Sequence, residues 1–186
     1  MSSSSDAETT LGLLVASPQM LDTNFSRTLV LLCQHDSQGA LGVVINRETN
    51  LSVREVVEQL DFDSMLETDN QVLWGGPVEQ GAGFVVFAGD IGDDVGWNLA
   101  DGQIAVSPSK ELLERLLRHQ QQYHLCLGYA GWGPGQLEEE ISTGSWLYTE
   151  AEPDLILQAP VDERYELALA KMGLSLGGFW MKPINE

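Results

Sequence analysis

Short apolar runs separated by turns of hairpin length constrain the fold of this chain more than any other feature. Mainly apolar residues occupy 11–16, 28–33, 41–45 and 83–88. Runs of this length bounded by turn residues predict buried strands, and the polar turn between the second and third runs predicts a hairpin. The predicted strands do not alternate strictly with predicted helices. We therefore predict an α+β fold with a mixed sheet, and not a doubly wound nucleotide-binding fold.

Two serine signals predict where the first long helices begin. Ser52 and Glu55 have the spacing of a capping box, so a helix is expected from there to about Leu60. Ser107 followed by Pro108 predicts an N-cap and a first helical residue. The remaining elements are predicted as a strand from 125, strands at 72–74, 103–106, 146–149 and 155–158, a loop at 89–102, a short acidic helix ending near 144, and a last helix from about 161 capped by Gly173.

Length and composition favour one globular domain. The chain has 186 residues and 43% hydrophobic residues, enough for a single core. Residues 1–10 lack the basic and apolar regions of a secretory signal, so we expect a disordered tail there and one domain over 11–186. No apolar run approaches the roughly 20 residues of a membrane span. A cytoplasmic protein without a membrane partner is the expectation.

The charge balance is strongly acidic. The chain has 28 acidic residues and 9 Lys and Arg, a formal net charge of −19. No Lys or Arg occurs between Arg54 and Lys110, or between Arg118 and Arg164. Because nucleic-acid affinity comes mainly from cations that neutralise phosphates, this composition disfavours direct DNA or RNA binding.

The stretch 125–146 is the strongest candidate for a functional site. A strand leads into the glycine-rich turn 131–135 and then into a helix, which is a common way to build a ligand site. The turn lacks the Lys-Ser/Thr pair of a phosphate loop, and Glu138 and its neighbours would repel a phosphate. A neutral polar ligand or the backbone of a partner fits better. Alternatively, the glycines are structural and allow close packing around Trp132.

Asn46 and Arg47 follow an apolar strand in a chain with few cations. The arginine fork suits planar anions, so Arg47 is predicted either to form a salt bridge with Glu138 or Asp22, the favoured interpretation, or to bind the carboxylate of a ligand. Both alternatives stay open from the sequence.

Cys33 and Cys126 lie inside apolar runs. Buried free thiols are the simpler interpretation, and a redox pair is the alternative, which would require their Cα atoms to lie within roughly 7 Å.

Three further motifs fail on their context. The G-x-S-x-G pattern at 173–177 follows a helix and has no histidine after it, so it is not a nucleophile elbow. The aspartates in 90–101 lack the spacing of a calcium loop. His35, His119 and His124 lack the spacing of metal ligands. No metal, cofactor or catalytic set is predicted.

Four segments of the chain resemble the AlgH/YqgE family of bacterial proteins. They are LLVASPQMLDTNFSRTLVLLCQH (13–35), GALGVVINR (39–47), LWGGPV (73–78) and GYAGWGPGQLEEEISTGSW (128–146). The resemblance implies a single domain with a bifurcated sheet, part of it closed into a small barrel, surrounded by helices. It also implies a role in transcriptional regulation, after which the family is named, but no activity or catalytic residues.

The four turns that end apolar strands form the predicted binding surface. We expect them to gather at one edge of the sheet and to bind a protein partner or small molecule without catalysis. The alternatives are an enzyme of unknown class, a thiol-based redox protein, and a transcriptional regulator. The candidate residues are Ser17, Pro18, Asn46, Arg47, Gly75, Gly76, Pro77, Gly131, Trp132, Gly133, Gln136 and Glu138.

Overall fold

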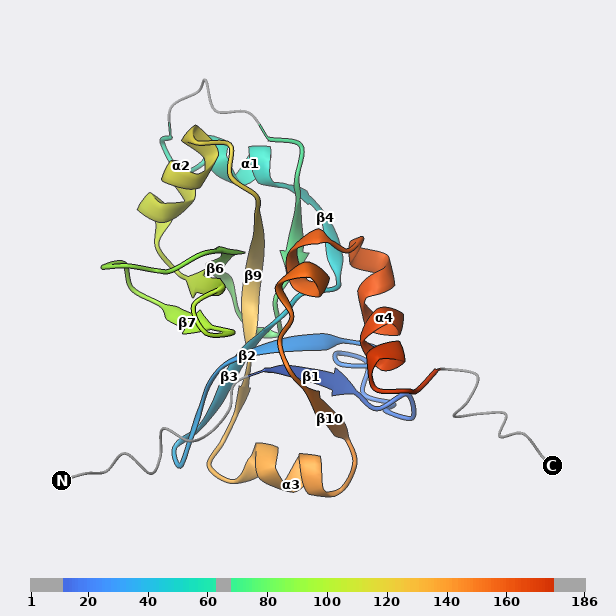
Figure 1. Cartoon of the computed structure of the whole chain (residues 1–186). Coiled ribbons are helices and arrows are strands. Elements are labelled where there is room, and N and C mark those ends of the chain that lie inside the picture. Colours follow the sequence, from blue (N-terminus) through green and yellow to red (C-terminus); the bar gives the residue numbers. More distant parts are fainter. Residues whose placement is uncertain (1–11, 63–67, 176–186) are drawn as a thin grey trace.

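A long strand, β9 (Tyr123–Trp132), organises the computed structural model, which describes residues 12–62 and 68–175. Its last residues pair with β3 (Gly39–Val44), and the rest of it pairs with β6 (Val78–Ala88). Both pairings are antiparallel, whereas β5 (Gln71–Trp74) lies parallel to its middle. The sheet therefore branches at β9, and the predicted α+β fold with a mixed sheet is confirmed (Figure 1).

The sheet is open. Its strands follow the order β10-β1-β2-β3-β9-β6-β8-β7, and β4 and β5 form a side branch. The terminal strands β10 and β7 do not pair with each other within the described residues, so the closed barrel implied by the family resemblance is wrong. Closure requires every strand to continue the ladder at a consistent tilt, and these two edge strands are short. The other strands are β1 (Leu13–Ala16), β2 (Leu29–Asp36), β4 (Glu48–Ser52), β7 (Trp97–Leu99), β8 (Ile104–Ser107) and β10 (Trp146–Thr149).

Helices cover the two ends of β9 and one side of the sheet. α1 (Val53–Glu58) and α2 (Lys110–Arg118) lie at one end, and α3 (Gln136–Ser142) lies at the other (Figure 1). α4 (Arg164–Lys171) follows a 3₁₀ turn (Val161–Glu163) at the side. The predicted capping box is confirmed, because Ser52 Oγ accepts from the Glu55 amide and Glu55 bonds the Ser52 amide in return.

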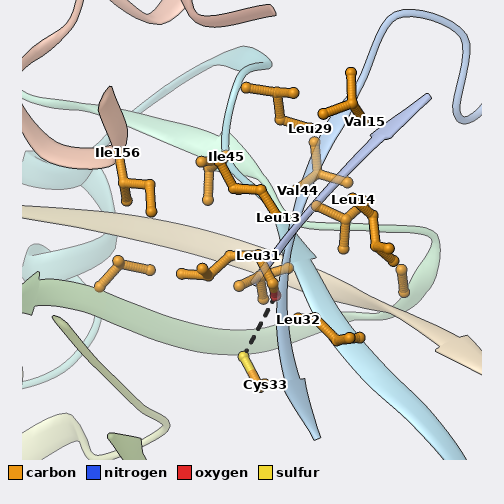
Figure 2. Packing of buried hydrophobic residues seen from close by; sticks show 14 of the residues in the cluster. Leu13, Leu14, Val15, Leu29, Leu31, Leu32, Cys33, Val44, Ile45 and Ile156 are labelled. Carbon is orange, nitrogen blue, oxygen red and sulfur yellow. Dashed lines mark hydrogen bonds between the residues drawn. The ribbon is translucent and has the colours of Figure 1, made fainter. Parts of the chain in front are cut away.

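Two apolar cores lie on opposite faces of β9. The larger core contains β1, β2, β3 and side chains such as Cys126, and Figure 2 shows its close packing around Leu13, Leu31 and Ile45. The smaller core contains the apolar faces of α1 and α2 and includes Leu125. Because successive strand residues point to opposite faces, β9 contributes to both cores.

Two sequence predictions about local structure are wrong. Residues 154–158 form a π-helix and not a strand, since a short apolar run does not by itself distinguish the two. The N-cap of α2 is Ser109, whose Oγ accepts from the Leu112 amide, and not Ser107. Ser107 ends β8, where its hydroxyl donates to the Val95 carbonyl and accepts from the Ser109 amide.

Two strands were missed by the sequence analysis. β4 is polar and half-exposed, and β7 has three residues inside the predicted loop. The predicted tail and the end of the G-x-S-x-G pattern lie outside the described residues. Among the described helices, none has the length and apolar character to cross a membrane.

Candidate functional site

An aromatic cluster lies beneath the loop that joins β1 to β2, here called the clamped loop (residues 17–28). The ring centroid of Phe25 lies 6.4 Å from those of Trp74 and Trp132 and 5.6 Å from that of Trp146. Trp132 and Trp146 are themselves 5.8 Å apart, edge to face, an arrangement that aromatic rings favour. The cluster brings the clamped loop next to the ends of β5 and β9 and the start of β10.

Asn46 and Arg47 hold the clamped loop by its backbone. Asn46 Oδ1 accepts from the Leu29 amide at 2.8 Å, and Asn46 Nδ2 donates to the Arg27 carbonyl at 2.9 Å. Arg47 donates from Nη1 to the Asn24 carbonyl at 2.6 Å and from Nη2 to the Ser26 carbonyl at 2.8 Å. The hydrogen bonds of Arg47 are of the stronger kind because their donor is charged. Together with those of Asn46, they fix the loop.

Arg47 does not form the predicted salt bridge. Its guanidinium lies 5.1 Å from the centroid of the Trp74 ring, a cation–π contact, while its other partners are backbone carbonyls. Partial burial lowers the pKa of Arg47, and the nearby Asp22 carboxylate opposes that shift. Glu138, the other predicted partner, lies beside His35 instead, with Nε2 to Oε2 at 3.3 Å and without the alignment of a hydrogen bond.

The glycine-rich turn 131–135 is stabilised by side chains of α3. Gln136 Oε1 accepts from the Gly133 amide at 2.9 Å, and Gln136 Nε2 donates to Glu140 Oε2 at 2.9 Å. Glu140 Oε1 accepts from the indole Nε1 of both Trp132 and Trp146 at 3.0 Å. One carboxylate therefore joins the turn, the helix and two strands. These contacts favour the structural interpretation of the turn.

The turn at Gly75, Gly76 and Pro77 is also tightly packed. Gly75 and Gly76 are buried, and a Cβ at Gly76 would lie 2.1 Å from the carbonyl carbon of Tyr129. Gly76 also has a φ of +152°. Glycine is required here because the end of β5 runs directly against β9.

Ser17 and Pro18 begin the accessible part of the clamped loop. The Ser17 amide donates to the Ser145 carbonyl at 2.9 Å, which places the loop beside the turn between α3 and β10. A hollow of about 380 Å³ lies between them, lined by residues 17, 19–21 and 143–145. Leu21, at its rim, is 90% exposed.

The predicted turns therefore meet through contacts around one aromatic cluster. The sequence predicted that these segments gather, but it did not show which of their residues make internal contacts. Glu140 was missed as a residue that connects the segments. The spacing of Gln136 and Glu140, four residues apart on a helix, was the available signal.

Comparisons with known proteins agree with this architecture. A family model described as AlgH-like matches residues 13–177. The chain belongs to the AlgH-like family. Among its relatives, a UPF0301 protein of Burkholderia thailandensis is 39% identical over 181 residues, covering 94% of each chain, and one of Thioalkalivibrio sulfidiphilus is 37% identical over 166 residues, covering 88% of this chain and 89% of the relative.

Two solved structures are similar to this AlgH-like chain. The solution structure of the AlgH protein from Pseudomonas aeruginosa has a TM-score of 0.74 and 34% identity, and the match covers 100% of both chains. Protein DIP2367 from Corynebacterium diphtheriae has a TM-score of 0.69 and 23% identity, covering 88% and 87%, which supports the fold alone.

The two cysteines of this family member are free and buried. Burial raises the pKa of the Cys126 thiol to about 12, although nearby Arg164 opposes the rise. Burial also raises the pKa of Cys33, whose Sγ donates to the Leu31 carbonyl at 3.6 Å (Figure 2). Since the thiolate is the reactive form, this environment favours inert structural thiols.

A buried arginine that the sequence analysis missed ties α4 to the sheet. Arg164 is 1% exposed, and it donates to the Ala159 and Ile45 carbonyls at 2.9 and 2.8 Å. Its Nη2 lies 2.8 Å from His124 Nε2. Burial and then the Arg164 charge lower the pKa of His124 to about 4. His124 is therefore the neutral acceptor of an arginine bond.

A hollow of about 660 Å³ lies away from the clamped loop, between residues 87–94 and α2. Asp94 pairs there with Arg115. Within the described residues, no three His, Cys, Asp or Glu side chains are grouped as metal ligands. We therefore place the candidate site at the clamped loop, where the predicted turns meet, and not in this hollow.

Proposed function

We propose that this AlgH-like chain is a non-enzymatic accessory protein of the cytoplasm. It binds a protein partner through the tip of the clamped loop (residues 19–23) and the turn 143–145. The observation that carries the proposal is the 90% exposure of Leu21 on a loop whose base is fixed. Free buried cysteines are consistent with a reducing compartment.

The fixed loop base favours binding. Asn46 and Arg47 together make three hydrogen bonds to the loop backbone and a fourth to the first amide of β2, and Asp22 Oδ1 accepts from the Asn24 amide at 2.7 Å within the loop. A loop that is already ordered costs less entropy when a partner binds. The accessible tip is thus presented in a preorganised conformation.

The tip has the character of a protein-binding surface. A single exposed leucine is ordinary on its own. Leu21, however, adjoins the 380 Å³ hollow that Ser17, Met20 and Gly144 help to line. This arrangement suits a partner that has a pocket for the leucine and a protruding side chain that enters the hollow. Small-molecule sites more often enclose their ligand, so a protein partner fits better.

Direct DNA binding is not part of this proposal. The net charge of −19 repels a polyanion at long range, so any regulatory effect would act through a partner. Fluorescence anisotropy with a labelled duplex at low salt tests this point, and no binding is expected. Binding that weakens steeply with added salt would contradict it.

The partner surface can be tested with a matched pair of exposed apolar residues. Leu21→Asp should remove capture of a specific protein from a bacterial lysate by the immobilised chain. Val95→Asp, at another exposed apolar position that is 72% exposed, should leave capture unchanged. The captured protein should also protect the amides of 19–23 from hydrogen exchange. Equal capture by wild type and Leu21→Asp, or protection elsewhere only, would refute the proposal.

A further inference from the structure

α1 and α2 lie at the end of β9 opposite α3 (Figure 1). A second, apolar groove lies there, lined by residues of α1, α2, β6 and β9. We call it the outer groove. Its volume is about 140 Å³. The apolar side chains that line it come from both helices and both strands, and they are Val56, Leu60, Val85, Leu113, Leu125 and Leu127.

Two glycines keep the outer groove open. Gly81 and Gly83 line it from the same face of β6 as Val85. A Cβ at Gly81 would meet nothing within 4 Å, and one at Gly83 would make only ordinary contacts of 3.5 Å with Leu125 and Leu127. Neither glycine has a positive φ. Glycine weakens a strand and often marks a place where a ligand approaches closely, and here backbone geometry does not require it.

The charge at the outer groove is opposite to that of the whole chain. Among the described residues that line the groove, Lys110 is the single charged one, although the chain carries 28 acidic residues. Within the described part of the chain, Lys110 forms no ion pair. Ser109 caps α2 beside it, so the positive end of the helix dipole faces the same mouth. Glu111, in the same turn, does not line the groove.

We propose that the outer groove binds a small carboxylate with an apolar body, such as a short-chain fatty acid. The carboxylate lies at Lys110 and the body covers the leucines of α2 and β9. The groove's 140 Å³ is close to the roughly 150 Å³ of an engineered cavity that holds benzene, so a body of about six carbons fits. This site is independent of the clamped loop and its partner.

Titration of the isotope-labelled full chain, followed by NMR, tests the proposal with hexanoate as the probe. Hexanoate should produce saturable shifts in the amides of Gly81, Gly83 and Leu113. Hexylammonium, which has the same chain length and the opposite charge, should bind more weakly by about three-fold or more, the size of an exposed charge contact. Absence of saturable shifts at these amides would overturn the proposal.

Variants separate the two parts of the groove. Lys110→Gln should remove the preference for hexanoate over hexylammonium, whereas Lys171→Gln, which removes a cation paired with Glu152 elsewhere, should preserve it. Gly83→Val should fill the groove and weaken hexanoate binding by about ten-fold, the loss of one buried apolar contact. If Gly83→Val does not fold, Gly81→Val replaces it. Unchanged hexanoate binding in the filled variant, or an unchanged preference in Lys110→Gln, would overturn the proposal.

Discussion

The two ends of β9 are packed against neighbouring helices by different kinds of contact. At the α3 end, Trp132 and Trp146 donate to one carboxylate, and Arg47 holds a loop by its carbonyls. At the α1 and α2 end, leucines and valines pack without polar contacts among them and leave a groove beside Gly83. The comparison teaches that the residues of a conspicuous motif, such as the turn 131–135, can be used for internal contacts. The open groove lies instead where the sequence shows only ordinary apolar residues.

The largest expected difference between the two ends comes from a pair of glycines. Gly76→Ala should destabilise the fold by about 4 kcal/mol or prevent folding, because its Cβ would overlap the Tyr129 backbone at a φ of +152°. Gly83→Ala, the matched change in the groove, should alter stability by less than about 1 kcal/mol. Urea unfolding measures both. Equal effects would show that the two ends are packed alike.

Removing the shared carboxylate should have the next largest effect. Glu140→Ala leaves the indole Nε1 groups of Trp132 and Trp146 without their acceptor in a buried setting, which should cost about 3 kcal/mol. Glu139→Ala, an exposed neighbour on the same helix, is the control and should cost little. If thermal unfolding shows the same small change for both, the carboxylate does not join the helix to the strands.

A smaller effect should depend on pH. The pKa of His124 is about 4 in the folded chain and 6.5 ordinarily, so the unfolded chain takes up the proton first as the pH falls. Its contribution to stability is complete above pH 6.5 and is lost between there and pH 4. The loss between pH 7 and 5 should be about 2 kcal/mol. His124→Gln should remove this part of the pH dependence in urea unfolding, and His119→Gln, at an exposed site, should retain it. A wild-type profile in His124→Gln would contradict the assignment.

Much of the local structure follows from the sequence. The capping box at Ser52 and Glu55, the short helix before Gly144 and the strand 146–149 were predicted from local chemistry and are confirmed. The π-helix at 154–158 was not, because an apolar run of three residues packs as well in either conformation. The second cap was misplaced since the segment offers two serines around Pro108, and the tertiary contact of Ser107 with Val95 decides between them.

The sequence by itself determined the fold class and the order of the apolar strands along the chain. These depend on periodicity, turn chemistry and burial, which act over a few residues. Only the tertiary structure decided the partners of Arg47, the internal role of Gln136 and the open groove at Gly83. Those features depend on side chains far apart in the chain, and their hydrogen bonds and remaining space exist only after the strands have packed.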